Sequence, residues 1–160
     1  MKGAAKKEKT ADVSGTHLWL VLMKAHRALQ RLAIRSIEAS ECGLSDFAVM
    51  EMLLHKGPQP VNEIGRRIEL TSGAITTAVD RLESLGLVTR EAHPSDRRAR
   101  IVQLTAAGKE QSAKIFAVHK AAMDSAASGL SKTERATLIE LLRKLGTSAG
   151  TQAVLEQAED

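Results

Sequence analysis

The first regular apolar pattern in the chain follows a lysine-rich N-terminal arm. Within residues 16–41, apolar side chains recur at alternating steps of four and three residues, at Leu18, Leu22, Ala25, Leu29 and Leu32. This spacing places them along one face of an amphipathic helix, which needs a second surface to pack against. Cys42-Gly43 follows this stretch, and Gly closes helices at low steric cost. The pattern therefore predicts a long N-terminal helix over about residues 16–41.

A second apolar stripe follows directly. Ser45 is a candidate cap, and the apolar face of the next helix comprises Phe47, Met50, Leu53 and Leu54. The run Gly57-Pro58-Gln59-Pro60 cannot continue a helix, because proline lacks the backbone donor and clashes with the preceding turn. We therefore expect a second helix that ends at a short connector.

Two short helical patterns come after the connector. The first covers residues 61–69, with Ile64 and Ile68 on one side, and the second is capped by Thr71 or Ser72 and runs to Gly86. Two short helices across a tight turn form a helix-turn-helix. This motif is predicted at about residues 61–85.

The next two segments favour strands. Residues 87–91 and 100–104 are rich in β-forming residues, and the polar stretch between them contains Pro94. This arrangement predicts a β-hairpin over about residues 87–104. Its loop is longer and more basic than a two-residue turn requires, so its tip should stand out from the body as a wing.

Two further helices are predicted over about residues 105–146. Thr105 is a candidate cap for an alanine-rich helix, Gly129 breaks that helix, and Ser131-Lys132-Thr133-Glu134 has the pattern of a capping box. Residues 147–160 are expected to be a weakly ordered tail. The fold class expected is mainly α: a winged helix-turn-helix with a β-hairpin wing and helices at both ends.

Length and charge narrow the class of protein. The chain has 160 residues, which suits a single domain over residues 16–146, and its net charge of +4 favours a polyanionic partner without naming one. Residues 1–15 are expected to be a flexible basic arm. Aromatic residues make up only 2% of the chain, so the core should be aliphatic.

Several classes of protein find no support in the sequence. One cysteine cannot form an intramolecular disulfide, and no apolar run reaches the ~20 residues of a membrane span, so we expect a cytoplasmic protein that needs no membrane. The chain has no phosphate-binding Gly loop, no nucleophile elbow and no evident pair of catalytic carboxylates. We therefore expect neither an enzyme nor a cofactor.

The order of these elements resembles the MarR family of transcriptional regulators. The resemblance spans residues 18–145 and is sharpest in the run LTSGAITTAVDRLESLGLVTREAHPSDRRARIVQLTAAG at residues 70–108. Within it the family's wing signature D-x-R is Asp96-Arg97-Arg98, followed by Leu104-Thr105 and Gly108. The resemblance implies a homodimer that binds palindromic double-stranded DNA, with the N- and C-terminal helices (about residues 16–41 and 105–146) as the dimerisation region.

Candidate DNA-binding residues lie on the second helix of the motif and on the wing. The helix presents small side chains that would let it enter the ~12 Å major groove: Ser72, Ala74, Thr76 and Thr77. Arg98 is the candidate for a narrow minor groove, and Arg97 for phosphates. Arg81 could also touch phosphate, unless Asp80 or Glu83 occupies it.

Other charged residues are given supporting roles. Asp96 is acidic in a loop expected to face DNA, so we assign it to hold Arg90 or Arg98 in place, and the resemblance implies the same bracing role. Arg66 and Arg67, on the first helix of the motif, are candidates for positioning it against the phosphate chain.

Regulators that this chain resembles usually respond to a small molecule, often an aromatic one, in a cleft beside the dimer region. Candidate lining residues on the first helix are His17, Trp19, Met23 and His26, although Trp19 also suits simple packing. Ala48 stands where the urate-responsive branch would carry an acidic residue, so urate is not predicted.

Other functions stay open: a redox or metal sensor, an architectural DNA-binding protein, and a protein-interaction module. Cys42 invites a peroxide-sensor reading, but it lies at a helix end and the chain has no Tyr to stabilise a thiolate. His26, Cys42 and His119 could converge on zinc, although no close ligand pair exists. A non-specific architectural DNA-binding protein and a pure protein-interaction module are further alternatives; the latter has no need of the basic wing.

Overall fold

The computed structural model describes residues 12–92 and 100–159. Most of the basic arm lies outside these residues, as do the wing-loop candidates Asp96, Arg97 and Arg98. The elements are α1 (Gly15–Glu38), α2 (Leu44–Lys56), β1 (Gln59–Pro60), α3 (Val61–Arg67), α4 (Ser72–Ser84), β2 (Val88–Ala92), β3 (Arg100–Leu104), α5 (Ala106–Ala126) and α6 (Lys132–Glu159). The chain divides into two compact units, Met1–His119 and Lys120–Asp160.

The first two helices are close to the predicted ones, but their junction differs. Ser14 caps α1, its hydroxyl accepting a hydrogen bond from the backbone N–H of His17 at 3.1 Å. The helix ends at Glu38, and Glu41 makes the turn in the left-handed region at φ 54°. The predicted Ser45 cap is wrong: α2 already begins at Leu44, and Gly43 precedes it without a side-chain cap.

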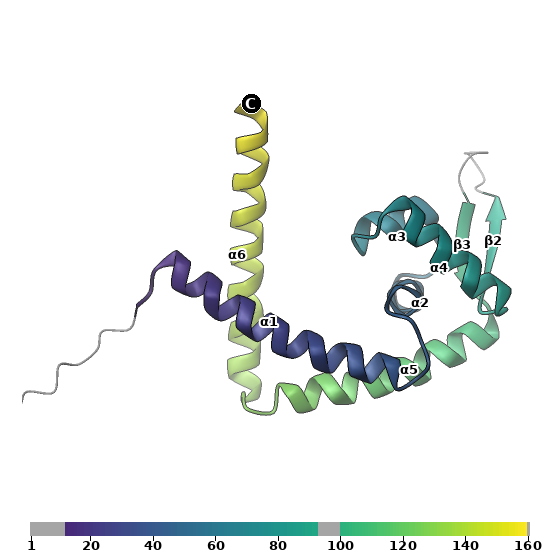
Figure 1. Cartoon of the computed structure of the whole chain (residues 1–160), viewed down its shortest axis with the longest axis horizontal. Coiled ribbons are helices and arrows are strands. Elements are labelled where there is room, and N and C mark those ends of the chain that lie inside the picture. The colour runs from purple at the N-terminus through teal and green to yellow at the C-terminus, as the bar shows by residue number, and fades with distance from the viewer. Residues whose placement is uncertain (1–11, 93–99, 160) are drawn as a thin grey trace, which may run out of the picture. The chain divides into compact units, whose positions relative to one another are not determined.

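A small antiparallel sheet packs beside the helix-turn-helix (Figure 1). Its strand order is β1-β3-β2, with Val88 opposite Leu104 and Ala92 opposite Arg100. The hairpin was predicted, but β1 was not: the connector we expected to be irregular pairs with β3, Gln59 opposite Val102. Because β1 lies at the sheet edge, its proline costs no ladder hydrogen bond on the outer side.

The core of the first unit is aliphatic, as the composition predicted, and it joins the helix-turn-helix to the sheet. Its fully buried side chains come from α2, α3, α4 and both hairpin strands: Val49, Met50, Ile64, Val79, Leu82, Val88 and Val102. Gly108 lets α5 approach this body closely, since a Cβ there would lie 1.9 Å from the backbone oxygen of Leu87. Thr105 caps α5 as predicted, its Oγ1 accepting from the N–H of Gly108 at 3.0 Å.

The second unit holds the end of α5 and α6. The predicted capping box is present: the N–H of Ser131 donates to Glu134 at 2.8 Å, and the N–H of Glu134 donates to the Ser131 hydroxyl at 3.3 Å. The predicted end of this helix is wrong, because α6 continues beyond Gly146 to Glu159. Among the described helices, none combines the length and hydropathy that a membrane crossing requires.

Candidate nucleic-acid interface

The outer face of α4 carries the helix candidates for base contact. Ser72, Thr76 and Thr77 are exposed and Ala74 is half-buried, whereas Ile75 and Val79 on the opposite face are buried. Thr71 is the cap, its Oγ1 accepting from the N–H of Ala74 at 3.2 Å. The first turn of α4 therefore offers small side chains outward while its inner face is fixed in the core.

The hydroxyl proton of Thr76 is already used in a hydrogen bond within α4. Its Oγ1 donates to the backbone oxygen of Ser72 at 2.8 Å. A hydroxyl has one proton, so in this rotamer Thr76 presents only acceptor lone pairs to the outside. It would suit the exocyclic amino groups of adenine or cytosine, which are the donors in the major groove.

Arg81 is tied to α2 rather than to its neighbours on α4. Its Nε and Nη2 donate to the two carboxylate oxygens of Asp46 at 2.6 and 2.5 Å. The Asp46 side chain is 8% exposed and that of Arg81 is 49% exposed. The hydrogen bonds and the charge of Asp46 raise the pKa of Arg81 above its already high value. The alternative that Asp80 or Glu83 would occupy Arg81 is therefore wrong, and the Arg81 side chain as a whole remains about half exposed.

Asp80 and Glu83 hold Arg90 instead. The Arg90 guanidinium donates to Asp80 at 2.5 Å and to Glu83 at 3.0 Å, and its side chain is only 24% exposed. These bonds connect β2 to α4. The predicted pairing of Arg90 with Asp96 concerns a residue outside the described ones, but the described partners already account for two of the Arg90 nitrogens.

Arg66 and Arg67 lie on α3, the first helix of the helix-turn-helix. Both contact Glu63, Arg66 through Nη2 at 2.8 Å and Arg67 through Nε at 3.5 Å. The hydrogen bond and charge of Arg66 lower the pKa of Glu63, so this carboxylate stays ionised. Two arginines against one glutamate leave 2 − 1 = +1 on an exposed helix face. The surface suits phosphate contact, the role suggested by the sequence.

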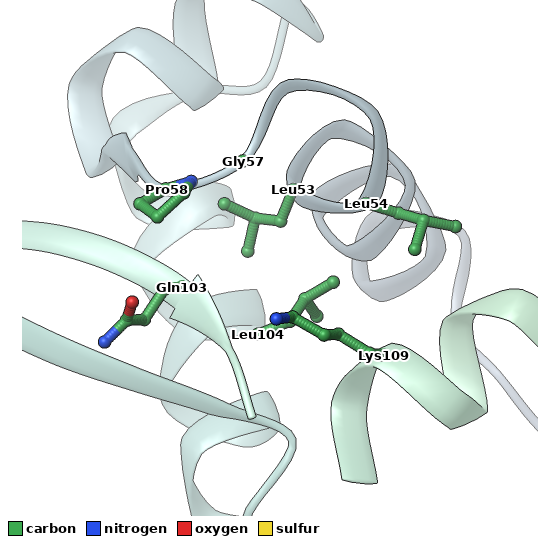
Figure 2. A pocket seen from close by; sticks show the side chains of 7 residues that line it. All are labelled: Leu53, Leu54, Gly57, Pro58, Gln103, Leu104 and Lys109. Carbon is green, nitrogen blue, oxygen red and sulfur yellow. The ribbon is translucent and has the colours of Figure 1, made fainter. Parts of the chain in front are cut away.

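The predicted effector residues lie along α1. His17, Trp19 and His26 are exposed and Met23 is half-buried. Trp19 is 59% exposed, so within this chain it is not core packing. None of the four lines the cavity of about 320 Å³ that opens between α2, β3 and α5 (Figure 2). That cavity was not foreseen, because its walls come from residues about fifty positions apart.

The described residues give little support to the hypotheses of a peroxide sensor at Cys42 or a zinc site. Cys42 is half-buried, and its pKa is raised by burial and by the charge of Asp46, against a smaller opposing effect of Arg81. Its Sγ lies 3.5 Å from the oxygen of Gly43. His119 Nδ1 is 2.9 Å from the Ser36 hydroxyl. Across residues 12–92 and 100–159 no three His, Cys, Asp or Glu side chains gather as a metal site.

Known proteins share this arrangement. The model of the MarR family matches residues 44–99, from α2 into the wing loop. HTH-type transcriptional regulator MhqR of Bacillus subtilis (strain 168) is 39% identical over 132 residues, which are 82% of this chain and 91% of MhqR.

Solved structures show the same fold. A mutant MarR from E. coli, complexed with operator DNA, superposes with a TM-score of 0.70 at 23% identity, over 84% of this chain and 99% of that one. Bordetella bronchiseptica BpsR, described with regulation of its DNA binding by 6-hydroxynicotinic acid, gives 0.71 at 22% identity, over 81% and 98%. From its family match, its relative and its winged helix-turn-helix, the chain belongs to the MarR family of DNA-binding transcriptional regulators.

Proposed function

We propose that this regulator is a homodimeric repressor that binds an inverted-repeat operator and leaves it when a small molecule binds. The observation that carries the proposal is the outer face of α4: small, exposed side chains on a helix whose inner face is buried and whose flanks are tied to α2 and β2. A rigid helix with a small-residue face can enter the major groove without rearrangement.

DNA contacts divide into two kinds under this proposal. Ser72, Thr76 and Thr77 read base edges, with Ala74 in apolar contact, while the open half of Arg81 binds phosphate. Arg97 and Arg98 are assigned from the sequence to phosphate and minor groove. MarR from E. coli, which shares the fold, has been solved with operator DNA, and this supports the same mode of docking.

Two copies of the chain are needed to distinguish an operator from other DNA sequences. One short helix and one wing contact few base pairs, whereas a two-fold dimer doubles the contacts. Exposed apolar side chains suitable for an interface lie on α1 and on α6, and include Leu18, Leu29, Leu32, Leu138 and Leu142. Recognition helices of such a dimer would lie one DNA turn apart, about 34 to 36 Å.

Release by a small molecule completes the proposal. BpsR, with the same fold, is described with regulation of its DNA binding by 6-hydroxynicotinic acid. We propose that an effector here favours a dimer whose two α4 helices no longer match successive grooves. The α1 residues His17, Trp19, Met23 and His26 stay the candidates for a site beside the dimer region.

The experiment is selection of bound sequences from a random duplex library. The selected duplex and a scrambled control are then titrated at two salt concentrations. We expect an inverted repeat to be enriched and its preference to persist at the higher salt. Binding without enrichment would identify an architectural protein, and absence of binding would favour a protein-interaction module.

A further inference from the structure

Asp80 lies on the outer stripe of α4 together with Gly73, Thr76 and Thr77. All four residues are exposed, and the side chain of Asp80 is 57% exposed. Their spacing is i, i+3, i+4 and i+7, which places them on one face of the helix. Homeodomains contact base edges in the major groove with the same spacing on their third helix. When α4 enters the groove, Asp80 therefore faces base pairs alongside Thr76 and Thr77.

Gly73 supports the direction of this face. Glycine lowers the stability of a helix relative to alanine. A Cβ added at Gly73 would meet no atom within 4 Å, so packing among the described residues does not require the missing side chain. The bare backbone there can instead approach a body outside the chain closely. The stripe thus combines a close backbone approach near one end with a carboxylate about two helical turns further along.

The Asp80 carboxylate is held at one oxygen and open at the other. Arg90 donates from Nη2 to Oδ1 of Asp80 at 2.5 Å, and from Nη1 to Oε2 of Glu83 at 3.0 Å. Within the described residues, Oδ2 of Asp80 has no hydrogen-bond partner. The charge of Arg90 partly offsets the repulsion between this carboxylate and DNA phosphates, and its hydrogen bond fixes the orientation of the carboxylate.

An open carboxylate oxygen distinguishes the four bases, because it can only accept a hydrogen bond. In the major groove cytosine presents the donor N4, whereas guanine presents two acceptors, thymine presents O4, and adenine places the acceptor N7 beside its amino group. A carboxylate is therefore attracted to cytosine and repelled by acceptors on the other three bases.

Thr76 and Asp80 address different base pairs. Thr76 also presents only acceptor lone pairs to the outside, and it lies four residues before Asp80, about 6 Å along the helix axis. Neighbouring base pairs are about 3.4 Å apart. A base preference caused by Asp80 can therefore be separated from one caused by Thr76.

We propose that Asp80 is a specificity-determining residue of the DNA contact: its Oδ2 accepts a hydrogen bond from the N4 amino group of one cytosine in each half-site, and Arg90 is its positioning residue. This assignment rests on the proposed function, because it requires α4 in the major groove. Glu83 lies in the last turn of α4, which ends at Ser84, and the N-terminal part of such a helix contacts base edges. Glu83 therefore holds Arg90 without contacting a base.

The test compares the wild-type chain with Asp80→Asn and Asp80→Ala. Bound sequences are selected from a random duplex library, and duplexes that differ at one base pair are then titrated. For the wild-type chain we expect one cytosine position in each half-site at which the other three bases weaken binding about fivefold to thirtyfold. Asp80→Asn should prefer adenine there, because a carboxamide matches N6 and N7 of adenine. Asp80→Ala should lose the preference for cytosine and keep the preferences at other positions.

Glu83→Gln is the matched control, because it removes the charge of the other Arg90 partner and leaves Asp80 unchanged. It should keep the wild-type preference for cytosine, and circular dichroism checks that each variant is folded. Loss of this preference in Glu83→Gln would show that the preference depends on the placement of Arg90 and β2, and would overturn a base contact by Asp80.

A modified duplex tests the same contact without any variant. The cytosine is replaced by 2-pyrimidinone, which lacks the N4 amino group, and the same replacement outside the half-site is the control. The wild-type chain should bind the modified half-site about fivefold to thirtyfold more weakly than the unmodified one. Equal affinities for the two duplexes would refute a hydrogen bond to N4.

The selection also separates this assignment from the proposed function. An enriched inverted repeat with the same base preferences for the wild-type chain and Asp80→Asn would overturn the role of Asp80 alone. Absence of an enriched repeat for the wild-type chain would overturn the proposed function, and the role of Asp80 with it.

Discussion

The ion pair between α2 and α4 gives the sharpest energetic prediction. Arg81 donates two hydrogen bonds to Asp46, whose side chain is 8% exposed, while the Arg81 side chain is 49% exposed. Removal of either partner breaks the same two bonds but leaves a different group behind. The two single variants Arg81→Met and Asp46→Asn should therefore differ in cost.

The magnitudes follow from what each variant leaves unpaired. Arg81→Met leaves a buried carboxylate with no counter-charge, and in a fully buried pair this lowers the free energy of unfolding by about 3–5 kcal/mol. Because the Arg81 side chain is half exposed, solvent near it reduces the expected loss to about 2–3 kcal/mol. Asp46→Asn leaves an arginine that water can solvate and an amide that still accepts one hydrogen bond. Asp46→Asn should therefore lower the free energy of unfolding by about 1 kcal/mol.

The assay is urea unfolding followed by far-ultraviolet circular dichroism, at one fixed protein concentration because association adds to the stability of a dimer. Glu110→Gln, which removes an exposed pair with Lys114, is the matched control and should leave the unfolding midpoint unchanged. Equal costs for the two variants of the α2–α4 pair, or a greater cost for Asp46→Asn, would refute the argument from burial.

The remaining predictions concern packing, DNA contact and the thiol. Gly108→Ala should lower the free energy of unfolding by more than about 2 kcal/mol, measured by the same urea assay, because the new methyl group would overlap the Leu87 carbonyl. Thr76→Ala should relax base preference in duplex titrations more than it lowers affinity for scrambled DNA; a uniform loss would leave Thr76 a positioning role. Arg98→Ala should weaken binding to the selected duplex by about 1–3 kcal/mol, and an unchanged affinity would remove it from the interface. Burial raises the pKa of Cys42, which reduces its thiolate fraction at pH 8. Alkylation of Cys42 by iodoacetamide should therefore be slower in the folded protein than in the urea-unfolded chain, and it should accelerate as pH rises. An equal alkylation rate in the folded and unfolded states would contradict this prediction.

Local patterns were enough to predict most of the elements. The apolar periodicity of α1 and α4 and the Ser131 capping box depend on residues within one or two helical turns, and the structure confirms them. The cap of α4 was expected at Thr71 or Ser72, and the structure places it at Thr71. The hairpin strands were recognisable for the same reason, since they alternate β-forming residues on both sides of a polar turn.

Features that depend on distant partners could not be predicted in this way. Gln59-Pro60 is a strand only because β3 lies beside it, and nothing in those two residues signals pairing. Asp46 and Arg81 meet across 35 positions, and the nearer carboxylates on α4 are taken by Arg90 from the next strand. The cavity near Lys109 likewise exists only where three elements converge.

Reading of an inverted repeat by two copies of α4 can be measured by hydroxyl-radical footprinting of the protein on the selected duplex. We expect two protected patches of equal strength, related by two-fold symmetry and about 10 base pairs apart, centre to centre. A single protected half-site, or uniform protection that does not depend on sequence, would contradict it.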